Sequence, residues 1–279
     1  MVTNIYQKIE NVCKVAANKI AYKEFKNDKI IKVTYNEFEQ DIQKNIKYLK
    51  DLNLPFQAKI GVNINRGYKV CSLIAACSYL NYIYVPIDID YPDEYINYIN
   101  EEINLDVLIT QEKNSDLNFK IIEQNEKQNT SQNLSNECRF IYFTSGSTGN
   151  PKGVMHGEQQ FLDRIDWMIN TFPFEENEVM GQRAFLGTIP SEWDLFGAFF
   201  AERETIFIPD DIVRDINKFS EFIANNKITR VTLNPTLLNF SLTYQIDSSK
   251  LKTLKIAISL GEKLGSSVAQ DFWFCCKVF

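Results

Sequence analysis

The sequence predicts a layered α/β/α fold with mixed, mostly parallel sheets. Three observations support this prediction: short apolar runs alternate with stretches of helical length, polar turns separate them, and no internal repeat is visible. With 279 residues, of which 44% are hydrophobic, the chain can bury one large core or two smaller ones. We therefore expect helices on the faces of one or two sheets.

The first half of the chain alternates helices and strands. Residues 36–50 place Phe38, Ile42, Ile46 and Leu49 on one helical face. The elements that follow are expected at 59–63 (strand), 68–79 (helix), 83–87 (strand), from about 92 (helix) and 106–110 (strand). The apolar stretch 70–87 is interrupted by polar residues and a proline, which favours a buried helix and strand over a membrane span.

A polar segment divides the chain. Residues 124–136, QNEKQNTSQNLSN, lack any hydrophobic period, and we interpret them as a surface connection. A first α/β sub-region is then expected at 1–123 and a second at 137–279. In the second, strands are expected at 139–143, 205–209, 230–234 and 255–259, and helices at 159–172, 216–225 and 264–274.

Charge and cysteine content exclude several classes of function. The 30 basic and 36 acidic residues give a net charge of −6, which offers no footprint for nucleic acid or for an anionic membrane. The six cysteines show no CxxC spacing and no secretory leader precedes them, so we expect reduced thiols and a cytoplasmic location. No residue is assigned as a metal ligand.

A phosphate-binding loop is the most specific feature of the sequence. Residues 142–153 read YFTSGSTGNPKG and directly follow the apolar run that ends at Phe143. Glycines allow backbone N–H groups to turn inward, hydroxyls add donors, and a lysine adds positive charge. A flexible linker is the alternative, but linkers seldom carry Pro-Lys-Gly behind a β-like run. The residues expected to bind phosphate are Thr144, Ser145, Gly146, Ser147, Thr148, Gly149 and Lys152.

This loop is not a P-loop. The pattern GxxxxGK[ST] would need glycine at 151 and a hydroxyl at 153, where this chain has Pro151 and Gly153. The string instead resembles the signature of the adenylate-forming superfamily, which includes acyl-CoA synthetases, luciferases and the adenylation domains of nonribosomal peptide synthetases. VTYNEF at 33–38 and YVPIDIDYPDEYINYI at 84–99 are similar to further elements of that family.

The resemblance extends over essentially the whole chain. Segments 191–211, 228–242 and 257–264 resemble the next family elements in order. Asn81 stands where the family has glycine, which is tolerable because asparagine enters the left-handed region readily. Tyr95 replaces a family arginine and is a real departure. The fold implied is the large N-terminal domain of an adenylate-forming enzyme, incomplete at its C-terminal end.

The resemblance also implies a two-step reaction. A carboxylic or amino acid attacks the α-phosphate of ATP with Mg²⁺, pyrophosphate leaves, and the acyl adenylate is captured by the phosphopantetheine thiol of a peptidyl carrier protein. Positioning and charge neutralisation would carry the catalysis, so a structural role is expected for the single histidine, His156. The turn containing Gly261 and Glu262 would line the adenine pocket. The acid pocket is expected to include Ile189, Pro190, Asp194, Thr232, Ile258 and Leu260.

Two features depart from the family. The aspartate that pairs with a substrate amine in FDxSVWE corresponds to Ile189, and its place in the related FVDSVWE branch corresponds to Pro190. Because a buried ammonium without a partner costs several kcal/mol, three alternatives remain open. The acid has no amine there, Glu192 or Asp194 replaces the anchor, or selection has been lost. Asp194 aligns with the glutamate of WE, which favours a helical residue over an anchor.

The second departure is at the C-terminal end. The family continues into NxYGPTE, a ribose-binding aspartate, a hinge and a small domain with the catalytic lysine, and the magnesium-linked glutamate also belongs to that region. We expect either the N-terminal segment of an adenylation domain that needs this C-terminal segment as a partner, or a catalytically inactive relic with weak nucleotide affinity. The chain alone should show no acid-dependent ATP–pyrophosphate exchange.

Overall fold

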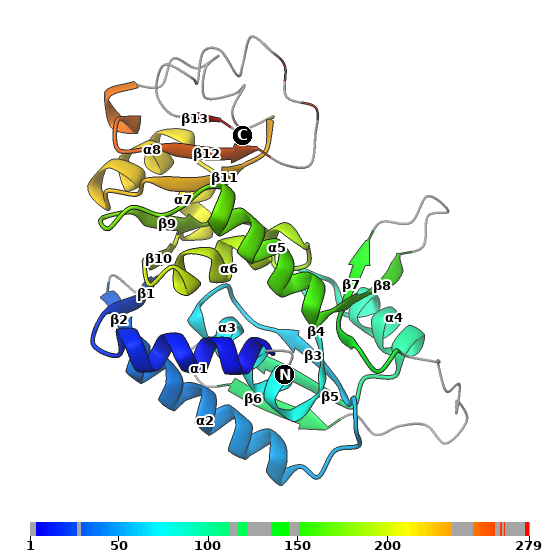
Figure 1. The fold of residues 1–279 in the computed structure, drawn as a ribbon. Coiled ribbons are helices and arrows are strands. Elements are labelled where there is room, and N and C mark those ends of the chain that lie inside the picture. Colours follow the sequence, from blue (N-terminus) through cyan, green and yellow to red (C-terminus); the bar gives the residue numbers. More distant parts are fainter. Residues whose placement is uncertain are drawn as a thin grey trace. The chain divides into compact units, whose positions relative to one another are not determined.

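Two compact units make up the protein, which was examined as a computed structural model (Figure 1). The structure describes residues 4–26, 29–111, 117–121, 135–144, 151–235, 248–259, 263, 265 and 277–278. The first unit comprises Met1–Ala17, Tyr35–Trp167 and Leu186–Ile189, and the second comprises Asn18–Thr34, Met168–Phe185 and Pro190–Phe279. Each unit is built on one mixed sheet. The predicted mixed, mostly parallel α/β fold is confirmed.

The sheet of the first unit has the strand order β6-β5-β3-β4-β7-β8. Its four central strands are parallel, and β6 and β8 pair antiparallel at the two edges. An antiparallel strand at the edge of a parallel sheet is common in α/β proteins. The strands are β3 (Lys59–Asn63), β4 (Ile83–Pro86), β5 (Val107–Gln111), β6 (Leu117–Ile121), β7 (Cys138–Thr144) and β8 (Lys152–Gly157).

Helices cover both faces of this sheet. The helices are α1 (Ile5–Ala16), α2 (Tyr35–Asp51), α3 (Tyr68–Leu80), α4 (Asp93–Ile103) and α5 (Glu158–Thr171). On one face, Ile99 and Ile103 of α4 pack in a core cluster with Ile141 of β7. On the other, Phe161 of α5 stacks on Phe140 of β7, with 5.3 Å between ring centroids. Successive residues of β7 therefore serve opposite layers, as strand geometry requires.

The end of α3 confirms one local prediction. Asn81 is the C-cap residue and has φ of 58°, in the left-handed region. Its side-chain Oδ1 accepts a hydrogen bond from Arg139 Nη2 at 2.8 Å, which ties this cap to β7.

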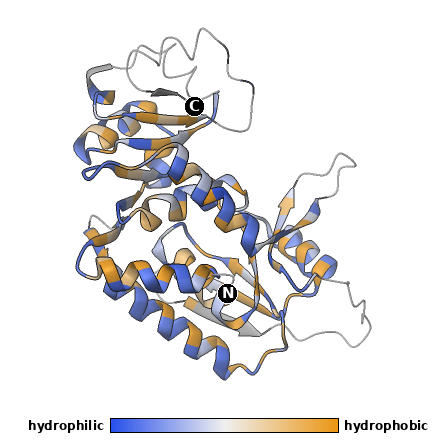
Figure 2. Ribbon diagram, viewed as in Figure 1, coloured by the Kyte–Doolittle hydropathy of each residue, from blue (hydrophilic) through white to orange (hydrophobic). Residues whose placement is uncertain are grey.

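No helix in the described part of the chain is both long and apolar enough to cross a membrane. In Figure 2, helices α1 and α2 carry hydrophilic and hydrophobic residues along their whole lengths.

The sheet of the second unit has the order β13-β12-β11-β9-β10-β1-β2, and only the β1–β2 pair is antiparallel. Its strands are β1 (Ile20–Lys26), β2 (Lys29–Thr34), β9 (Val179–Gln182), β10 (Glu204–Phe207), β11 (Arg230–Leu233), β12 (Ile256–Ser259) and β13 (Lys277–Val278). The helical segments are α6 (Pro190–Phe200), α7 (Asp210–Val213), α8 (Ile216–Asn225) and the 3₁₀ turn η1 (Ser248–Leu251).

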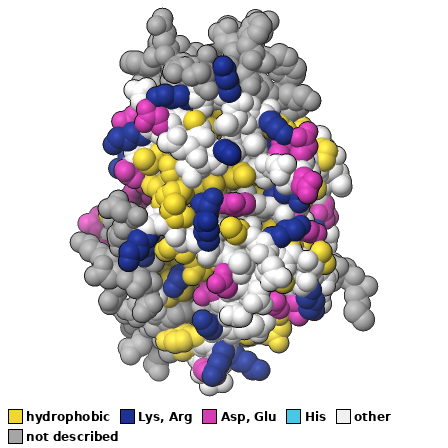
Figure 3. All heavy atoms as spheres, turned by 90° about the vertical axis from the view of Figure 1, so that its left-hand side faces the viewer, with side chains coloured by type: hydrophobic (Ala, Val, Ile, Leu, Met, Phe, Trp, Pro, Cys, Tyr) yellow, Lys and Arg dark blue, Asp and Glu magenta, His cyan; other side chains and the backbone are white. Residues whose placement is uncertain are grey.

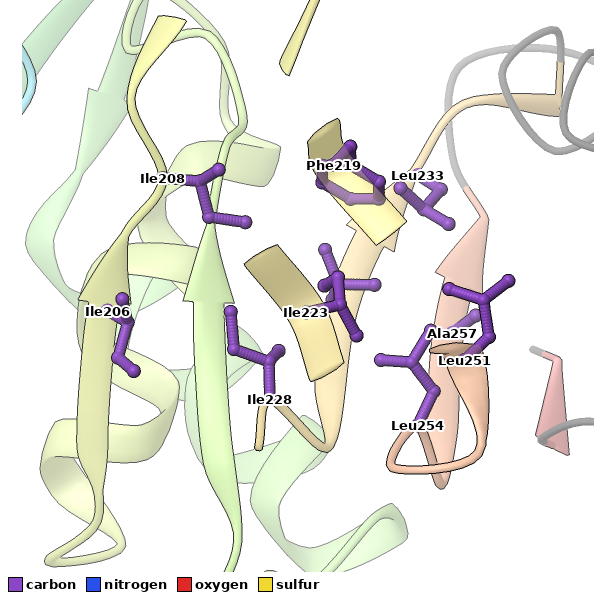
Figure 4. Close-up of a cluster of buried hydrophobic side chains, with 10 residues drawn as sticks. Ile206, Ile208, Phe219, Ile223, Ile228, Leu233, Leu251, Leu254 and Ala257 are labelled. Carbon is purple, nitrogen blue, oxygen red and sulfur yellow. The ribbon is translucent and has the colours of Figure 1, made fainter. Parts of the chain in front are cut away.

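Alternation along β11 assigns the two faces of this sheet. Leu233 of β11 lies in a buried cluster with Phe219 and Ile223 of α8 (Figure 4). The intervening residue Thr232 points the other way and contacts Asp194 of α6. The second unit is therefore layered too, with α8 on one face and α6 on the opposite face.

Most expected elements appear where the sequence places them, and some were not expected. The strand 59–63 and the helix 216–225 agree to the residue. Elements α1, β1, β2, β6, β8, β9, α7, η1 and β13 were not predicted. The helix expected at 264–274 lies outside the described residues apart from Gly265, as does most of segment 124–136. The division of the chain at that segment stays a prediction, while the two units found here follow the two sheets.

Candidate functional site

A β-hairpin in the first unit carries the predicted phosphate loop. Strands β7 and β8 pair antiparallel with Thr144 opposite Lys152, so these residues form the two ends of the loop. Both side chains are exposed at the edge of the sheet. The loop residues Ser145, Gly146, Ser147, Thr148 and Gly149 lie outside the described residues. The hairpin therefore brings a hydroxyl and a lysine to the same end of one strand pair.

Two features hold the strand residues next to the loop in place. Gly153 lies opposite Phe143, and a Cβ at this glycine would approach Ile141 Cγ2 to 3.1 Å, so a side chain would crowd the sheet. The Tyr98 hydroxyl of α4 donates a hydrogen bond to the Pro151 carbonyl at 2.8 Å. The end of the loop next to Lys152 is thus attached to the helical layer as well as to β7.

Two of the residues predicted for the acid pocket are neighbours in the second unit. Thr232 of β11 and Ile258 of β12 are direct partners across two parallel strands, and both are buried. They lie near the carboxyl ends of these strands, the edge at which α/β sheets bind ligands. Their side chains share the face on which α6 lies, because residues in register point to the same side of a sheet. Leu260, Gly261 and Glu262 lie outside the described residues.

Asp194 is fully enclosed by hydrogen-bond donors of its own unit. Its Oδ1 accepts a hydrogen bond from the Thr232 hydroxyl. Its Oδ2 accepts from the backbone N–H groups of Ala184 at 3.0 Å and Arg183 at 3.4 Å. The Arg183 guanidinium donates to the Thr232 carbonyl at 3.1 Å. Asp194 therefore joins α6, β11 and the segment after β9.

The environment of Asp194 also changes its protonation. Burial raises the pKa of this carboxyl from 3.8 to about 6, and the hydrogen bonds from Thr232, Ala184 and Arg183 oppose the rise. All three donors are neutral groups or backbone, so the carboxylate is solvated by dipoles with Arg183 as the nearby cation. A carboxylate held in this way has little capacity left to pair with a substrate ammonium.

The remaining pocket candidates lie at the start of α6. Ile189 immediately precedes the helix and belongs to the first unit, while Pro190 is its first residue and belongs to the second. Both are partly buried. Proline suits the first turn of a helix because it has no N–H to leave unpaired. Neither of these two side chains can pair with a charge. Glu192, two residues further along in α6, is buried.

The described residues show no sign of a metal centre or of a reactive thiol. They contain no group of three or more His, Cys, Asp or Glu side chains placed to hold a metal ion. On the face shown in Figure 3, basic and acidic side chains are interspersed. Cys13, Cys71, Cys77 and Cys138 are buried free thiols. Burial raises the pKa of Cys13 to about 12, which makes it a poor nucleophile at neutral pH.

Sequence reasoning missed two residues that the structure brings to these sites. Tyr98 lies in YPDEYINYI, which was interpreted only as a family element. Its spacing of three from Tyr95 places both on one face of α4, a signal that could have indicated a shared role. Arg183 follows β9, a strand whose four residues VMGQ carry no clear alternation. Arg183 forms hydrogen bonds with Thr232 and Asp194, and no spacing along the sequence indicates these contacts.

Sequence comparison decides the family. The AMP-binding enzyme family matches residues 9–278 of the chain. The chain belongs to the AMP-binding enzyme family. Membership in the adenylate-forming superfamily, predicted from the loop, is thereby confirmed.

Several relatives of this AMP-binding enzyme segment are peptide synthetases. Tyrocidine synthase 1 of Brevibacillus parabrevis is 23% identical over 244 residues, which cover 82% of this chain and 22% of that protein. Gramicidin S synthase 1 of Brevibacillus brevis is 25% identical, with coverage of 86% and 23%. Enterobactin synthase component F of Escherichia coli is also 25% identical, with coverage of 86% and 20%. The chain spans about a fifth of the length of these relatives.

Solved structures agree on the fold. The nonribosomal peptide synthetase FmoA3 superposes with a TM-score of 0.81 at 15% identity, covering 98% of this chain and 30% of that one. The N-terminal subdomain of Klebsiella oxytoca NpsA, in complex with 3-hydroxybenzoyl-AMSN, gives 0.78 at 14% identity, covering 99% and 71%. The N-terminal domain of FACL13 from Mycobacterium tuberculosis gives 0.80 at 15%, covering 99% and 75%. The chain thus has the fold of the N-terminal subdomain of adenylate-forming enzymes.

Proposed function

We propose that this chain is the N-terminal part of an adenylation domain that activates a carboxylic or amino acid with ATP. The product would be an acyl adenylate, and the acyl group would pass to the phosphopantetheine thiol of a carrier protein. The observation that supports this most is the β7–β8 hairpin, which ends in Thr144 and Lys152 on either side of the glycine and hydroxyl loop. The family match over residues 9–278 supports the same assignment.

The hairpin residues would act on the phosphates of ATP. The acid's carboxylate oxygen attacks the α-phosphorus, the bond to the β-phosphate oxygen breaks, and pyrophosphate leaves. Thr144 and the loop would donate hydrogen bonds to phosphate oxygens, while Lys152 would neutralise charge that moves toward the leaving group. Mg²⁺ would accompany ATP and offset phosphate charge. The described residues form no cluster for it, so its protein ligands are expected from the C-terminal segment of the domain.

The contacts of the described residues support one of the three alternatives for the acid. Ile189 and Pro190 provide no carboxylate, and the Asp194 carboxylate is occupied by Thr232 and two backbone N–H groups. We infer that the preferred acid has no ammonium group at the position where amino-acid-activating relatives pair it. Burying an unpaired ammonium beside Ile189 would cost several kcal/mol.

An exchange assay with a panel of acids tests this function. The chain is supplied with a C-terminal adenylation segment as a second polypeptide, and ATP–pyrophosphate exchange is measured with amine-free, α-amino and β-amino acids. We expect exchange with an amine-free acid and none by the chain alone. Exchange that is strongest with an amino acid and is lost in Glu192→Gln would assign the anchor to Glu192 and contradict the inferred acid. Absence of exchange with every acid would favour the inactive relic.

A further inference from the structure

Tyr91, just before α4, and Tyr95 and Tyr98 of α4 form a row of packed rings that ends at the phosphate hairpin. The rings of Tyr91 and Tyr95 meet edge to face with centroids 4.4 Å apart, and those of Tyr95 and Tyr98 stack at 6.3 Å. Tyr98, the last of the three, reaches the hairpin through its hydrogen bond to the Pro151 carbonyl. Tyr98 therefore links a packed helix to the residue that immediately precedes Lys152.

The position of Tyr98 relative to the hairpin is well determined by packing. Tyr98 packs against a buried cluster that contains Ile99 and Ile103, which follow it on α4, and Ile141 and Phe143 of β7. Because α4 and β7 share this core, a change in the helix position would disturb the same sheet that carries the loop. A group on such a packed element can hold a backbone atom more tightly than a group on a loop can.

Pro151 has only one backbone group with which it can be held. Proline has no N–H, so its carbonyl is its sole backbone hydrogen-bonding group. The hydrogen bond that this carbonyl accepts from the Tyr98 hydroxyl fixes the peptide plane between Pro151 and Lys152. On the opposite strand, Thr144 pairs with Lys152 in the β-ladder. The backbone of Lys152 is thus held from two sides, by β7 and by α4.

We propose that Tyr98 is a positioning residue for nucleotide binding, which sets the backbone of Pro151 and Lys152 so that the lysine meets the phosphates. This inference rests on the proposed function of the hairpin. Tyr98 acts through the Pro151 carbonyl and contacts no substrate. Loss of its hydroxyl frees the end of the loop and weakens nucleotide affinity without unfolding the unit.

A carboxylate competes for the same proton. Glu102, one turn further along α4, lies against the Tyr98 hydroxyl. A phenol has one proton to donate, so the Pro151 carbonyl and the Glu102 carboxylate draw on the same donor. In Glu102→Gln the side-chain amide can donate to the phenol oxygen instead, which leaves the phenol proton to Pro151. This variant should hold the loop end at least as well as the wild type does.

The test compares Tyr98→Phe with Tyr95→Phe in the full chain. Both changes remove one hydroxyl from α4, and the Tyr95 hydroxyl interacts with Tyr91, which precedes the helix. Trypsin cleavage after Lys152, followed by mass spectrometry, reports the freedom of the loop end, with cleavage after the exposed Lys47 of α2 as internal reference. Calorimetric titration with MgATP reports affinity.

We expect Tyr98→Phe to raise the ratio of cleavage at Lys152 to cleavage at Lys47 by about three- to tenfold, and to raise the Kd for MgATP by a similar factor, as loss of one hydrogen bond would. Tyr95→Phe should match the wild type in both, and Glu102→Gln should not cleave faster. Equal behaviour of Tyr98→Phe and Tyr95→Phe, or cleavage that rises equally at both lysines, overturns the inference. If the wild type fails to bind MgATP, the proposed function fails, and the role of Tyr98 in nucleotide binding fails with it. The cleavage ratio then still reports whether Tyr98 holds the end of the loop.

Discussion

The two ends of the second unit's sheet each bury a carboxylate, and they neutralise it in different ways. At the amino end, Glu178 accepts hydrogen bonds from the Arg230 guanidinium, including one from Nε at 2.8 Å. Arg230 also donates to the Phe172 carbonyl at 2.6 Å and lies over the Phe174 ring. At the carboxyl end, Asp194 is held by the Thr232 hydroxyl and by two backbone N–H groups.

This difference separates an end of the sheet that stabilises the fold from the end at which we propose that the acid binds. Arg230 pairs with Glu178 and with backbone carbonyls, so the two opposite charges balance each other. The Arg230 side chain is 1% exposed and the Glu178 side chain is 2% exposed. The dipolar cage around Asp194 holds a titratable group beside the strand ends at which α/β sheets bind ligands. Burial lowers the pKa of Arg230, which Glu178 opposes, while burial raises the pKa of Asp194 to about 6.

The largest effect should follow from breaking the ion pair. Arg230→Met removes the nearest cation from the buried Glu178 carboxylate and leaves Lys255 at 4.0 Å, so the free energy of unfolding should fall by about 3–5 kcal/mol. Urea denaturation measures this, with Lys218→Met on the exposed side of α8 as control. Replacing both partners, Arg230→Met with Glu178→Met, should restore most of the loss. A single variant as stable as the control would show that the pair does not stabilise this end.

Removing the other carboxylate should cost less. Asp194→Ala leaves the Thr232 hydroxyl and the N–H groups of Ala184 and Arg183 without their acceptor, at a cost of about 2–3 kcal/mol at pH 7. Asp211→Ala, at an exposed position of α7, is the matched control. Chemical denaturation of both variants gives the comparison. Equal stability of the two would mean that the cage is dispensable for folding.

The two ends should also differ in their response to pH. Because the pKa of Asp194 is about 6 in the folded protein and 3.8 as its ordinary value, the folded state binds the proton more tightly. The contribution to stability is complete below pH 4 and is lost as pH rises through 6. Between pH 7 and pH 5 the wild type should gain about 1 kcal/mol relative to Asp194→Asn. A parallel pH dependence of both proteins would contradict the raised pKa.

The smallest effect tests a single donor of the cage. Thr232→Val keeps the shape of the side chain and removes the hydroxyl that lowers the pKa of Asp194. The pKa of Asp194 should therefore rise further, and stability at pH 7 should fall by about 0.5–1 kcal/mol. A carbon-13 NMR titration of the Asp194 carboxyl measures the pKa. An unchanged titration midpoint would show that Thr232 contributes nothing to the cage.

Sequence periodicity was enough for elements whose pattern is set by burial. The strand at 59–63 and the helix at 216–225 were predicted to the residue because each has a regular apolar pattern. Strand β8, KGVMHG, was missed because it is an edge strand that is largely exposed and begins with the Lys-Gly of the loop. Such a strand is specified by its partner β7 and not by its own alternation.

The candidate site was predictable in residue type and not in role. The loop composition identified Thr144 and Lys152, and the structure places them in register at one end of a strand pair. The contacts around Asp194 depend on donors from two other parts of the chain, residues 183–184 and Thr232, which no local pattern predicts. Alignment with a helix glutamate was still enough to favour a helical residue over an anchor, and the enclosed carboxylate agrees.

Calorimetric titration of the full chain with MgATP tests the central claim most directly, that the hairpin binds the phosphates of ATP. The comparison is between wild type, Lys152→Ala and the exposed-helix control Lys47→Ala. We predict saturable binding by the wild type and by Lys47→Ala, with affinity weakened about tenfold or more in Lys152→Ala, as loss of a charge-assisted hydrogen bond would cause. Equal affinity of all three proteins, or no binding by the wild type, would contradict the account.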